Sequence, residues 1–363
     1  MVVFLPELRV LQVPADGTVI PIGPKLPLET LLQKVRQSRP DDSLVRFGSA
    51  HERDSFEDFP NKALNFFTRS RQGDLIHTFI NPYTGAILFQ DRNHRFLQEV
   101  YELHSDLLAG KPGRFVNAWF AVVLMMTSLA GLLLWWRGRK YWRVGVRYRP
   151  RAGWRTQSWD LHSLGGFLFS LPLLILALTG TYFSYERGFT AVAAVLTRSP
   201  NDGGTGWPSG GIYYEPRAAG GEAIEWRRLA VPKASLYPAK WQALDDIVHR
   251  AERQLPDCKV TTTSFPVANG TFSVRFHCPA EPYRSGLTFV YVDPPTARVV
   301  GIDRFSQSPL AVRLIRLTSP IHFGDIGGLS TRLFWVAIGL SPAGLFVTSL
   351  LMWWNRSLSN LAD

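Results

Sequence analysis

Three long windows of this 363-residue chain contain no Asp, Glu, Lys or Arg, and they constrain its fold more than any other feature. They run from Phe115 to Trp136, from Leu161 to Tyr185 and from Leu333 to Trp354. Each is long enough to cross a hydrocarbon core of about 30 Å as a helix. Because the bilayer core offers no water to backbone N–H and C=O groups, a single span must be helical. We therefore predict a membrane protein with three transmembrane helices in contact with a lipid bilayer.

The formal net charge of +11 is concentrated in one segment that follows the first apolar window. This segment contains eight basic residues and no acid: Arg137, Arg139, Lys140, Arg143, Arg147, Arg149, Arg151 and Arg155. Short loops rich in Lys and Arg stay on the cytoplasmic side of a membrane. The segment is therefore predicted to be cytoplasmic and to face anionic headgroups rather than nucleic acid. Residues 1–114 and 186–332 are then expected outside.

The two outer regions share one plan. In the first, the helical stretch PLETLLQKVRQSRP is followed by short strands, a turn at NPYTG and a second helical stretch, FLQEVYELHSDLL. In the second, WQALDDIVHRAERQLP, the strands KVTTTSF and TFSVRFHC, the turn VDPPTA and SPLAVRLIRLTSPIHFGD follow in the same order. Such self-similarity indicates a repeated unit. We predict an α+β membrane protein, with a transmembrane helix bundle and two outer α+β domains related by an internal repeat.

The repeat also predicts the domain boundaries and one further helix. The expected parts are residues 1–95 (first outer domain), 96–136 (elbow and transmembrane helix), 137–160 (basic cytoplasmic loop), 161–185 (transmembrane helix), 186–315 (second outer domain), 316–354 (elbow and transmembrane helix) and 355–363 (cytoplasmic tail). A span precedes the second unit, whereas only MVVFLPEL precedes the first, and no cleavable signal peptide is visible. We therefore expect a complete protein with four spans, whose first helix also directs it to the membrane.

The two cysteines, Cys258 and Cys278, flank a predicted hairpin centred near residue 268 and fall opposite each other on its two strands. An outer compartment permits oxidation, so a structural disulfide is expected, with two free thiols as the alternative. No other spacing of cysteine and histidine is typical of a zinc site.

Three of the eight histidines lie at or near the ends of the spans. Trp135 follows His104 by 31 residues, and Trp353 follows His322 by the same number. This spacing places both histidines at the outer ends of inward-running helices, whereas His162 begins a span at the cytoplasmic end. The others lie in the polar domains without a shared pattern and are expected to be surface residues: His51, His77, His94, His249 and His277.

Histidines at membrane depth are candidates for function. A neutral imidazole is an axial ligand of haem iron, and two of them form a six-coordinate centre suited to electron transfer. His104 and His322 are therefore predicted to share one haem at the outer face, and His162 to bind a second haem in the complete protein. The alternative is that each histidine is an interfacial residue bonded to a backbone carbonyl.

At these residues the chain resembles the PepSY-associated transmembrane-helix family, whose members are often called iron-regulated membrane proteins. The matching pieces are MVVFLPEL, LHSDLLAGKPGRF, AGLLLWWRGR, LHSLGGFLFSLPLLILALTGTYFSYE, PIHFGD and the final WW. The resemblance implies a four-helix core with two periplasmic PepSY-like domains in the bacterial inner membrane. It also implies that His104 and His322 match periplasmic b-type haem ligands and that His162 matches a cytoplasmic one. The chain departs from the family by lacking the first span.

Some members of this family resemble di-haem ferric-siderophore reductases. The resemblance therefore implies an oxidoreductase that takes electrons from an unidentified cytoplasmic donor and reduces a periplasmic ferric siderophore. Two alternatives remain open: a PepSY regulatory or binding membrane protein that has no cofactor, and an accessory subunit of a metal-uptake transporter.

Overall fold

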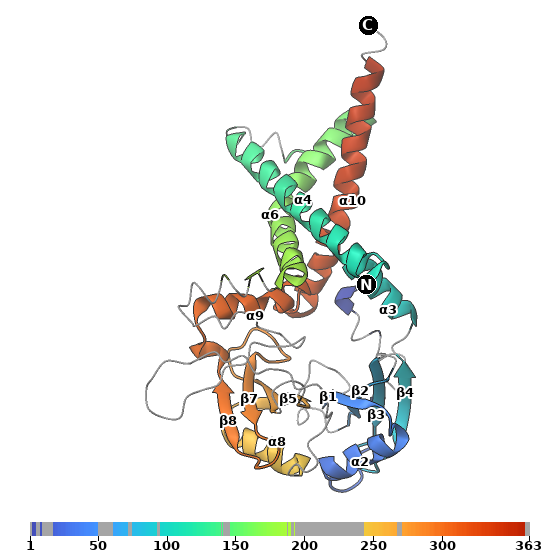
Figure 1. The fold of residues 1–363 in the computed structure, drawn as a ribbon. Helices are drawn as coiled ribbons and strands as arrows, with labels where there is room; N and C mark the ends of the chain where they lie inside the picture. Colours follow the sequence, from blue (N-terminus) through green and yellow to red (C-terminus); the bar gives the residue numbers. More distant parts are fainter. Residues whose placement is uncertain are drawn as a thin grey trace. The chain divides into compact units, whose positions relative to one another are not determined.

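A computed structural model gives the fold of the chain (Figure 1). It describes residues 2–4, 8, 17–49, 61–71, 75–92, 95–138, 140, 146–186, 188–189, 192, 243–266 and 271–359. The chain divides into two compact units, one that contains Glu102–Glu186 and Leu317–Asp363 and one that contains Val2–Tyr101 and Arg187–Arg316. Each unit is described separately below.

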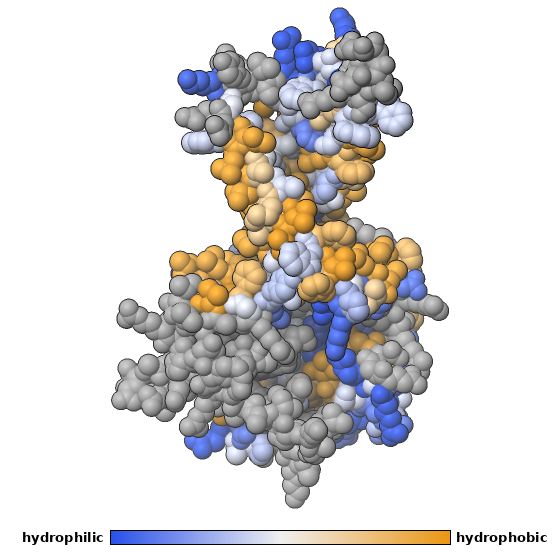
Figure 2. All heavy atoms as spheres, turned by 45° about the horizontal axis from the view of Figure 1, so that its top comes forward, coloured by the Kyte–Doolittle hydropathy of each residue, from blue (hydrophilic) through white to orange (hydrophobic). Residues whose placement is uncertain are grey.

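Three helices of the first unit are long and apolar enough to cross a membrane, as predicted: α4 (Gly110–Arg137), α6 (Trp154–Ser184) and α10 (Gly328–Ser359). α6 packs against both α4 and α10 (Figure 1). Many of their large apolar side chains are exposed, and Figure 2 shows a band of hydrophobic surface around these helices. An exposed apolar surface of this kind fits a helix bundle surrounded by lipid.

α6 begins at Trp154, seven residues before the predicted start of its span at Leu161, so the predicted loop 137–160 is shorter than expected. The reason is an ion pair between the exposed Arg149 and the buried Asp160. Arg149 donates hydrogen bonds to both carboxylate oxygens of Asp160, from its side-chain Nε and Nη2 at 3.0 and 2.8 Å. The prediction ended the apolar window at this acid, whereas the arginine neutralises it and lets the helix continue through it.

The second unit contains an eight-stranded antiparallel sheet in the order β4-β3-β2-β1-β5-β6-β7-β8. The strands are β1 (Ser43–Ser49), β2 (Leu64–Arg69), β3 (Leu75–Ile80), β4 (Ile87–Arg92), β5 (Lys259–Ser264), β6 (Phe272–His277), β7 (Thr288–Val292) and β8 (Val299–Asp303). The two regions that were predicted as separate outer domains thus join at β1 and β5. Both would otherwise be edge strands with unpaired backbone groups, and pairing satisfies them.

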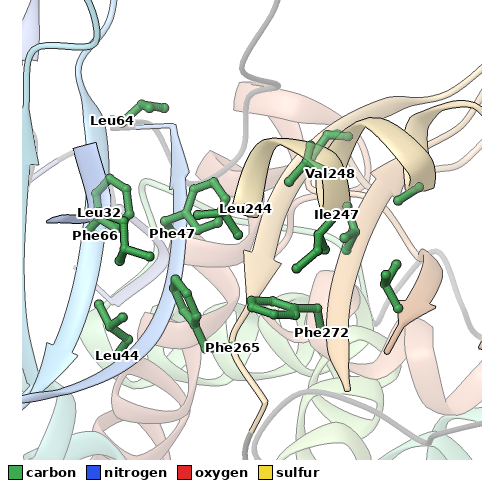
Figure 3. Close-up of a cluster of buried hydrophobic side chains, with 14 of the residues drawn as sticks. Leu32, Leu44, Phe47, Leu64, Phe66, Leu244, Ile247, Val248, Phe265 and Phe272 are labelled. Carbon is green, nitrogen blue, oxygen red and sulfur yellow. The ribbon is translucent and has the colours of Figure 1, made fainter. Parts of the chain in front are cut away.

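Two short helices, α2 (Leu28–Ser38) and α8 (Leu244–Glu252), cover one face of this sheet (Figure 1). They bury leucine and isoleucine side chains against Phe47, Phe66 and Phe272 in a core that is continuous across both halves (Figure 3). The helices also cap each other. The Asp245 carboxylate accepts hydrogen bonds from the Leu28 and Glu29 backbone N–H groups, at 2.8 and 3.1 Å. An acid at a helix N-terminus satisfies free N–H groups and the helix dipole.

Cys258 and Cys278 are joined by a disulfide beside this core. The hairpin tip between the cysteines, residues 267–270, lies outside the described residues. The two predicted turns are built alike, because the N–H groups of Asn81 and Asp293 each donate to the carbonyl five residues ahead, at 2.9 Å.

Two further helices lead into spans. α3 (Arg95–Asp106) precedes α4, and α9 (Leu310–His322) precedes α10. The elbow between α3 and α4 contains Leu107 and Leu108 in the left-handed region, at φ 56° and 59°. Two short 3-10 helices, η1 (Val2–Phe4) and η4 (Phe305–Gln307), complete the described elements.

Candidate functional site

The two histidines with matched spacing lie next to each other in the first unit. His104 is in the last turn of α3, and His322 is the last residue of α9. Their ring centroids are 6.2 Å apart, and the ring planes make an angle of 44°. The structure thus brings together two residues that are 218 positions apart in the sequence.

Glycines allow the elbows that carry these histidines. A Cβ atom on Gly113 would lie 1.7 Å from the Asp106 carbonyl oxygen, so only glycine lets α4 start this close to the end of α3. Gly324 has φ +68°, and a Cβ there would lie 3.1 Å from Trp335 Cγ. Asn117 secures the first elbow, because its Nδ2 donates to the His104 carbonyl at 2.8 Å. Side chains in α4 and α10 therefore hold the ends of α3 and α9.

Thr179 of α6 contacts the ring nitrogen Nδ1 of His322. Its Oγ1 lies 2.9 Å from His322 Nδ1, and the same hydroxyl donates to the Ile175 and Leu176 carbonyls at 2.9 and 3.0 Å. A hydroxyl whose one hydrogen is donated to its own helix accepts from the Nδ1–H of His322. Nδ1 then carries the proton, and Nε2 keeps the lone pair that can bind a metal.

The surroundings of His322 are apolar and aromatic. The Phe183 ring meets it edge-on at 5.2 Å, the Phe323 ring lies 5.7 Å away, and Gly180 places no side chain against its Cε1 atom. Burial, with a smaller effect from His104, lowers the pKa of His322 to about 4. Crowding by protein also lowers the pKa of His104, although part of its side chain is exposed. Both rings are therefore neutral at pH 7.

This donor set fits the haem that the sequence predicts. Two imidazoles that share a metal through bonds of about 2 Å, each nitrogen about 1 Å from its ring centre, have centroids about 6 Å apart. The observed separation is 6.2 Å. Both rings are neutral, His322 presents Nε2, and the neighbouring rings offer the apolar contacts that a porphyrin needs. Among the described residues, no three His, Cys, Asp or Glu side chains gather as they would around a metal ion.

His162 does not join this pair. It lies near the start of α6, 17 residues before Thr179, which is about 25 Å along a helix axis. Its Nδ1 is 3.0 Å from the Oγ1 of Thr348 in α10, and that hydroxyl donates to the Gly344 and Leu345 carbonyls at 2.9 and 3.0 Å. The Oγ of Ser349 lies 3.3 Å from the same Nδ1 atom, so two hydroxyls of α10 contact this nitrogen of His162.

Of the other histidines, His77 was predicted at the surface, and that prediction is wrong. It is 4% exposed within β3, between the Phe67 and Phe79 rings, with its Nδ1 3.2 Å from Asn65 Nδ2. Strand alternation places it on a covered face of the sheet. His249 is exposed on α8, and His277 is half-buried with its Nδ1 3.0 Å from the Tyr283 carbonyl. His51 and His94 lie outside the residues whose side chains are described.

No pattern in the sequence identified Thr179, Asn117 or Thr348 as part of the site. One signal was present: Thr179 and Gly180 are the last two residues of LALTG, a motif that was noted only as a resemblance. A threonine within an apolar helix often bonds its own backbone carbonyl, so sequence alone does not distinguish this role from a structural one.

Comparison with known proteins gives one family and one relative. The family described as "PepSY-associated TM region" matches residues 1–356. A protein of Pseudomonas aeruginosa named only as uncharacterised is 40% identical over 80 residues, which are 22% of this chain and 19% of that protein. The chain thus aligns with about a fifth of the length of that relative.

Proposed function

This chain belongs to the PepSY-associated TM region family, and we propose that it is a haem-binding oxidoreductase of the bacterial inner membrane. It would take electrons from a cytoplasmic donor and reduce a periplasmic ferric siderophore. The observation that carries this proposal is the pair His104 and His322: two neutral imidazoles with ring centroids 6.2 Å apart, one of them with its Nδ1 atom 2.9 Å from the Thr179 hydroxyl.

The residues of the site would have distinct tasks. His104 and His322 would hold a b-type haem, and Thr179 would accept a hydrogen bond from His322 Nδ1 and so leave Nε2 free to bind. The bound haem would supply one-electron transfer. The apolar rings of Phe183 and Phe323 would exclude water from the pair. The siderophore iron is substrate: hard oxygen ligands hold Fe²⁺ less tightly than Fe³⁺, so reduction would release it.

Two features support the proposed orientation. The segment between α4 and α6 is strongly basic, as expected for a cytoplasmic loop. The Cys258–Cys278 disulfide belongs to the unit that contains the sheet, and disulfides persist in oxidising compartments such as the periplasm. His162 would hold a second haem near the cytoplasmic surface.

Absorption spectra of the purified full chain test the proposal. We expect a Soret band and a sharp reduced α-band in protein from haem-replete cells. His104→Ala and His322→Ala should each remove the same haem, whereas His249→Ala, an exposed histidine on α8, should leave the spectrum unchanged. If both site variants keep the full wild-type spectrum, the pairing is wrong. A colourless wild-type protein would favour a PepSY regulatory protein or a transporter subunit without a cofactor.

A further inference from the structure

The helix α9, which leads into the span α10, has an apolar stripe along one side (Figure 1). Leu310, Leu314, Leu317 and Ile321 occupy positions i, i+4, i+7 and i+11, which lie on one face of an α-helix. Leu310 is 64% exposed and Leu314 is 57% exposed, whereas Leu317 and Ile321 are half-buried. The first half of this stripe is therefore open at the surface of the chain.

The buried side of α9 carries a charge. Val312 and Arg316 are both buried there. The Arg316 Nη2 atom is paired with the Asp303 carboxylate, and its Nη1 atom donates to the Leu287 carbonyl at 3.2 Å. A helix on the surface of a water-soluble protein buries its leucines and exposes its arginines. Because α9 buries an arginine and exposes leucines, its outer face is suited to apolar surroundings.

The helix α3, which leads into the span α4, has the same kind of stripe. Phe96, Val100 and Leu103 occupy positions i, i+4 and i+7, and the phenylalanine and Leu103 are more than half exposed. Asp106, the last residue of this helix, is buried. A single exposed apolar side chain is normal, whereas exposed apolar residues that gather on one face indicate an interaction surface.

The two stripes have equivalent positions relative to the histidine pair. Phe96 precedes His104 by eight residues, and Leu314 precedes His322 by the same number. A stripe residue also stands directly before each histidine, Leu103 in α3 and Ile321 in α9. The same surface thus occurs on both helices that carry the candidate site.

Both stripes lead directly into the spans. α4 begins four positions after the end of α3, and α10 begins six positions after the end of α9, so extended chain allows at most about 14 and 20 Å between these ends. Asn117 of α4 donates to the His104 carbonyl at 2.8 Å, and Thr331 of α10 donates to the Gly324 carbonyl at 2.7 Å. The ends of α3 and α9 therefore stay beside the first turns of the helices that enter the bilayer.

We propose that α3 and α9 are interfacial helices, whose apolar stripes are immersed in the lipid leaflet in which α4 and α10 begin. The partner of this surface is the bilayer, because it offers apolar contact at the depth where an amphipathic helix lies. The proposal goes beyond the proposed function and does not require a bound haem. Since Leu103 and Ile321 directly precede the two histidines, immersed stripes hold His104 and His322 at the level of the membrane surface.

Spin labels on single added cysteines test this placement in the full chain in lipid nanodiscs. The two native cysteines are joined in a disulfide, so only the added cysteine takes the label. The test variants are Phe96→Cys and Leu314→Cys. His249→Cys, at an exposed position of α8, is the control for water, and Leu340→Cys, at an exposed position of α10, is the control for lipid. Electron paramagnetic resonance measures the collisions of each label with oxygen, which concentrates in lipid, and with a water-soluble nickel chelate.

We expect both test labels to collide more with oxygen than with the nickel chelate, and to lie about 5–10 Å inside the headgroup boundary. The Leu340→Cys label should lie deeper, because position 340 is about 18 Å along the helix axis from the first residue of α10. The His249→Cys label should collide mainly with the nickel chelate. If Leu314→Cys does not fold, Leu310→Cys on the same stripe takes its place.

Three results would overturn the proposal. Nickel collisions as frequent at both test positions as at position 249 would place the stripes in water. Few collisions with either reagent would mean that protein covers the stripes, for example a second copy of the chain. Lipid contact at only one test position would refute the shared placement of α3 and α9.

Discussion

Replacing Thr179 with valine tests whether this hydroxyl controls the tautomer of His322. The change removes one oxygen atom and nearly preserves the shape of the side chain. In the structure this oxygen lies 2.9 Å from His322 Nδ1. The next residue, Gly180, has no side chain and leaves room for the imidazole. The variant therefore removes the hydrogen bond and leaves the packing of α6 in place.

The expected magnitude follows from the burial of the ring. Loss of the acceptor leaves a buried N–H unsatisfied, which costs about 1–3 kcal/mol. At about 1.4 kcal/mol per factor of ten, this is a loss of about 10- to 100-fold in haem affinity, the range that outer-shell partners of metal ligands show. Thr179→Ser keeps the hydroxyl and should restore most of the affinity.

Transfer of haem to an excess of apomyoglobin, followed by absorption, measures this affinity. Thr127→Val is the matched control, because Thr127 of α4 also donates to its own helix, to the Val123 and Leu124 carbonyls at 3.0 Å, and has no histidine beside it. The reduction potential of the bound haem gives a second readout, since a changed hydrogen bond to an axial ligand shifts it. If Thr179→Val loses haem no faster than Thr127→Val and keeps the wild-type potential, the assignment of the tautomer is refuted.

Three further predictions follow from the structure. Burial lowers the pKa of His322 to about 4, so its neutral, ligating ring persists to lower pH than that of an unperturbed histidine. Haem affinity should therefore stay level down to about pH 5 and decline below it. A spectral titration with a midpoint near 6.5 would contradict this prediction. The double substitution Cys258→Ser and Cys278→Ser should destabilise the sheet unit by about 3 kcal/mol in denaturant unfolding, because the disulfide closes a loop of 20 residues. Reductant should cause the same loss of stability in the wild type. Equal stability of the variant and the wild type would argue against a structural role of the disulfide. Gly113→Ala places a Cβ atom 1.7 Å from the Asp106 carbonyl oxygen, so this variant should lose the haem as fully as His104→Ala does, whereas Gly166→Ala, with open space around its Cβ, should keep it.

The sequence predicted the elements of this fold better than their assembly. The apolar windows predicted the three long helices. Alternating apolar residues and turn residues predicted strands in both of the regions that form the sheet. The start of α6 was missed because Asp160 ended the apolar window, and the arginine that neutralises it lies 11 residues earlier. The joining of the two regions at β1 and β5 could not be predicted, because backbone pairing between distant strands depends on packing rather than on local pattern.

For the candidate site, equal spacing identified His104 and His322, and the structure places them side by side. Thr179 lies 143 residues from His322, so no local pattern connects them. The burial of His77 was missed for a similar reason: a strand with two covered faces has no alternation that separates inside from outside.

The sequence by itself determined that the chain crosses a membrane, which of its loops is basic, and which histidines have equivalent positions relative to their spans. These properties depend on helix length, charge and spacing along one chain. Only the tertiary structure decided that one sheet unites the two halves of the sheet unit, and that the Thr179 hydroxyl lies beside Nδ1 of His322. Those properties depend on groups that folding brings together from distant positions in the sequence. The interactions between these groups form only once the chain has packed.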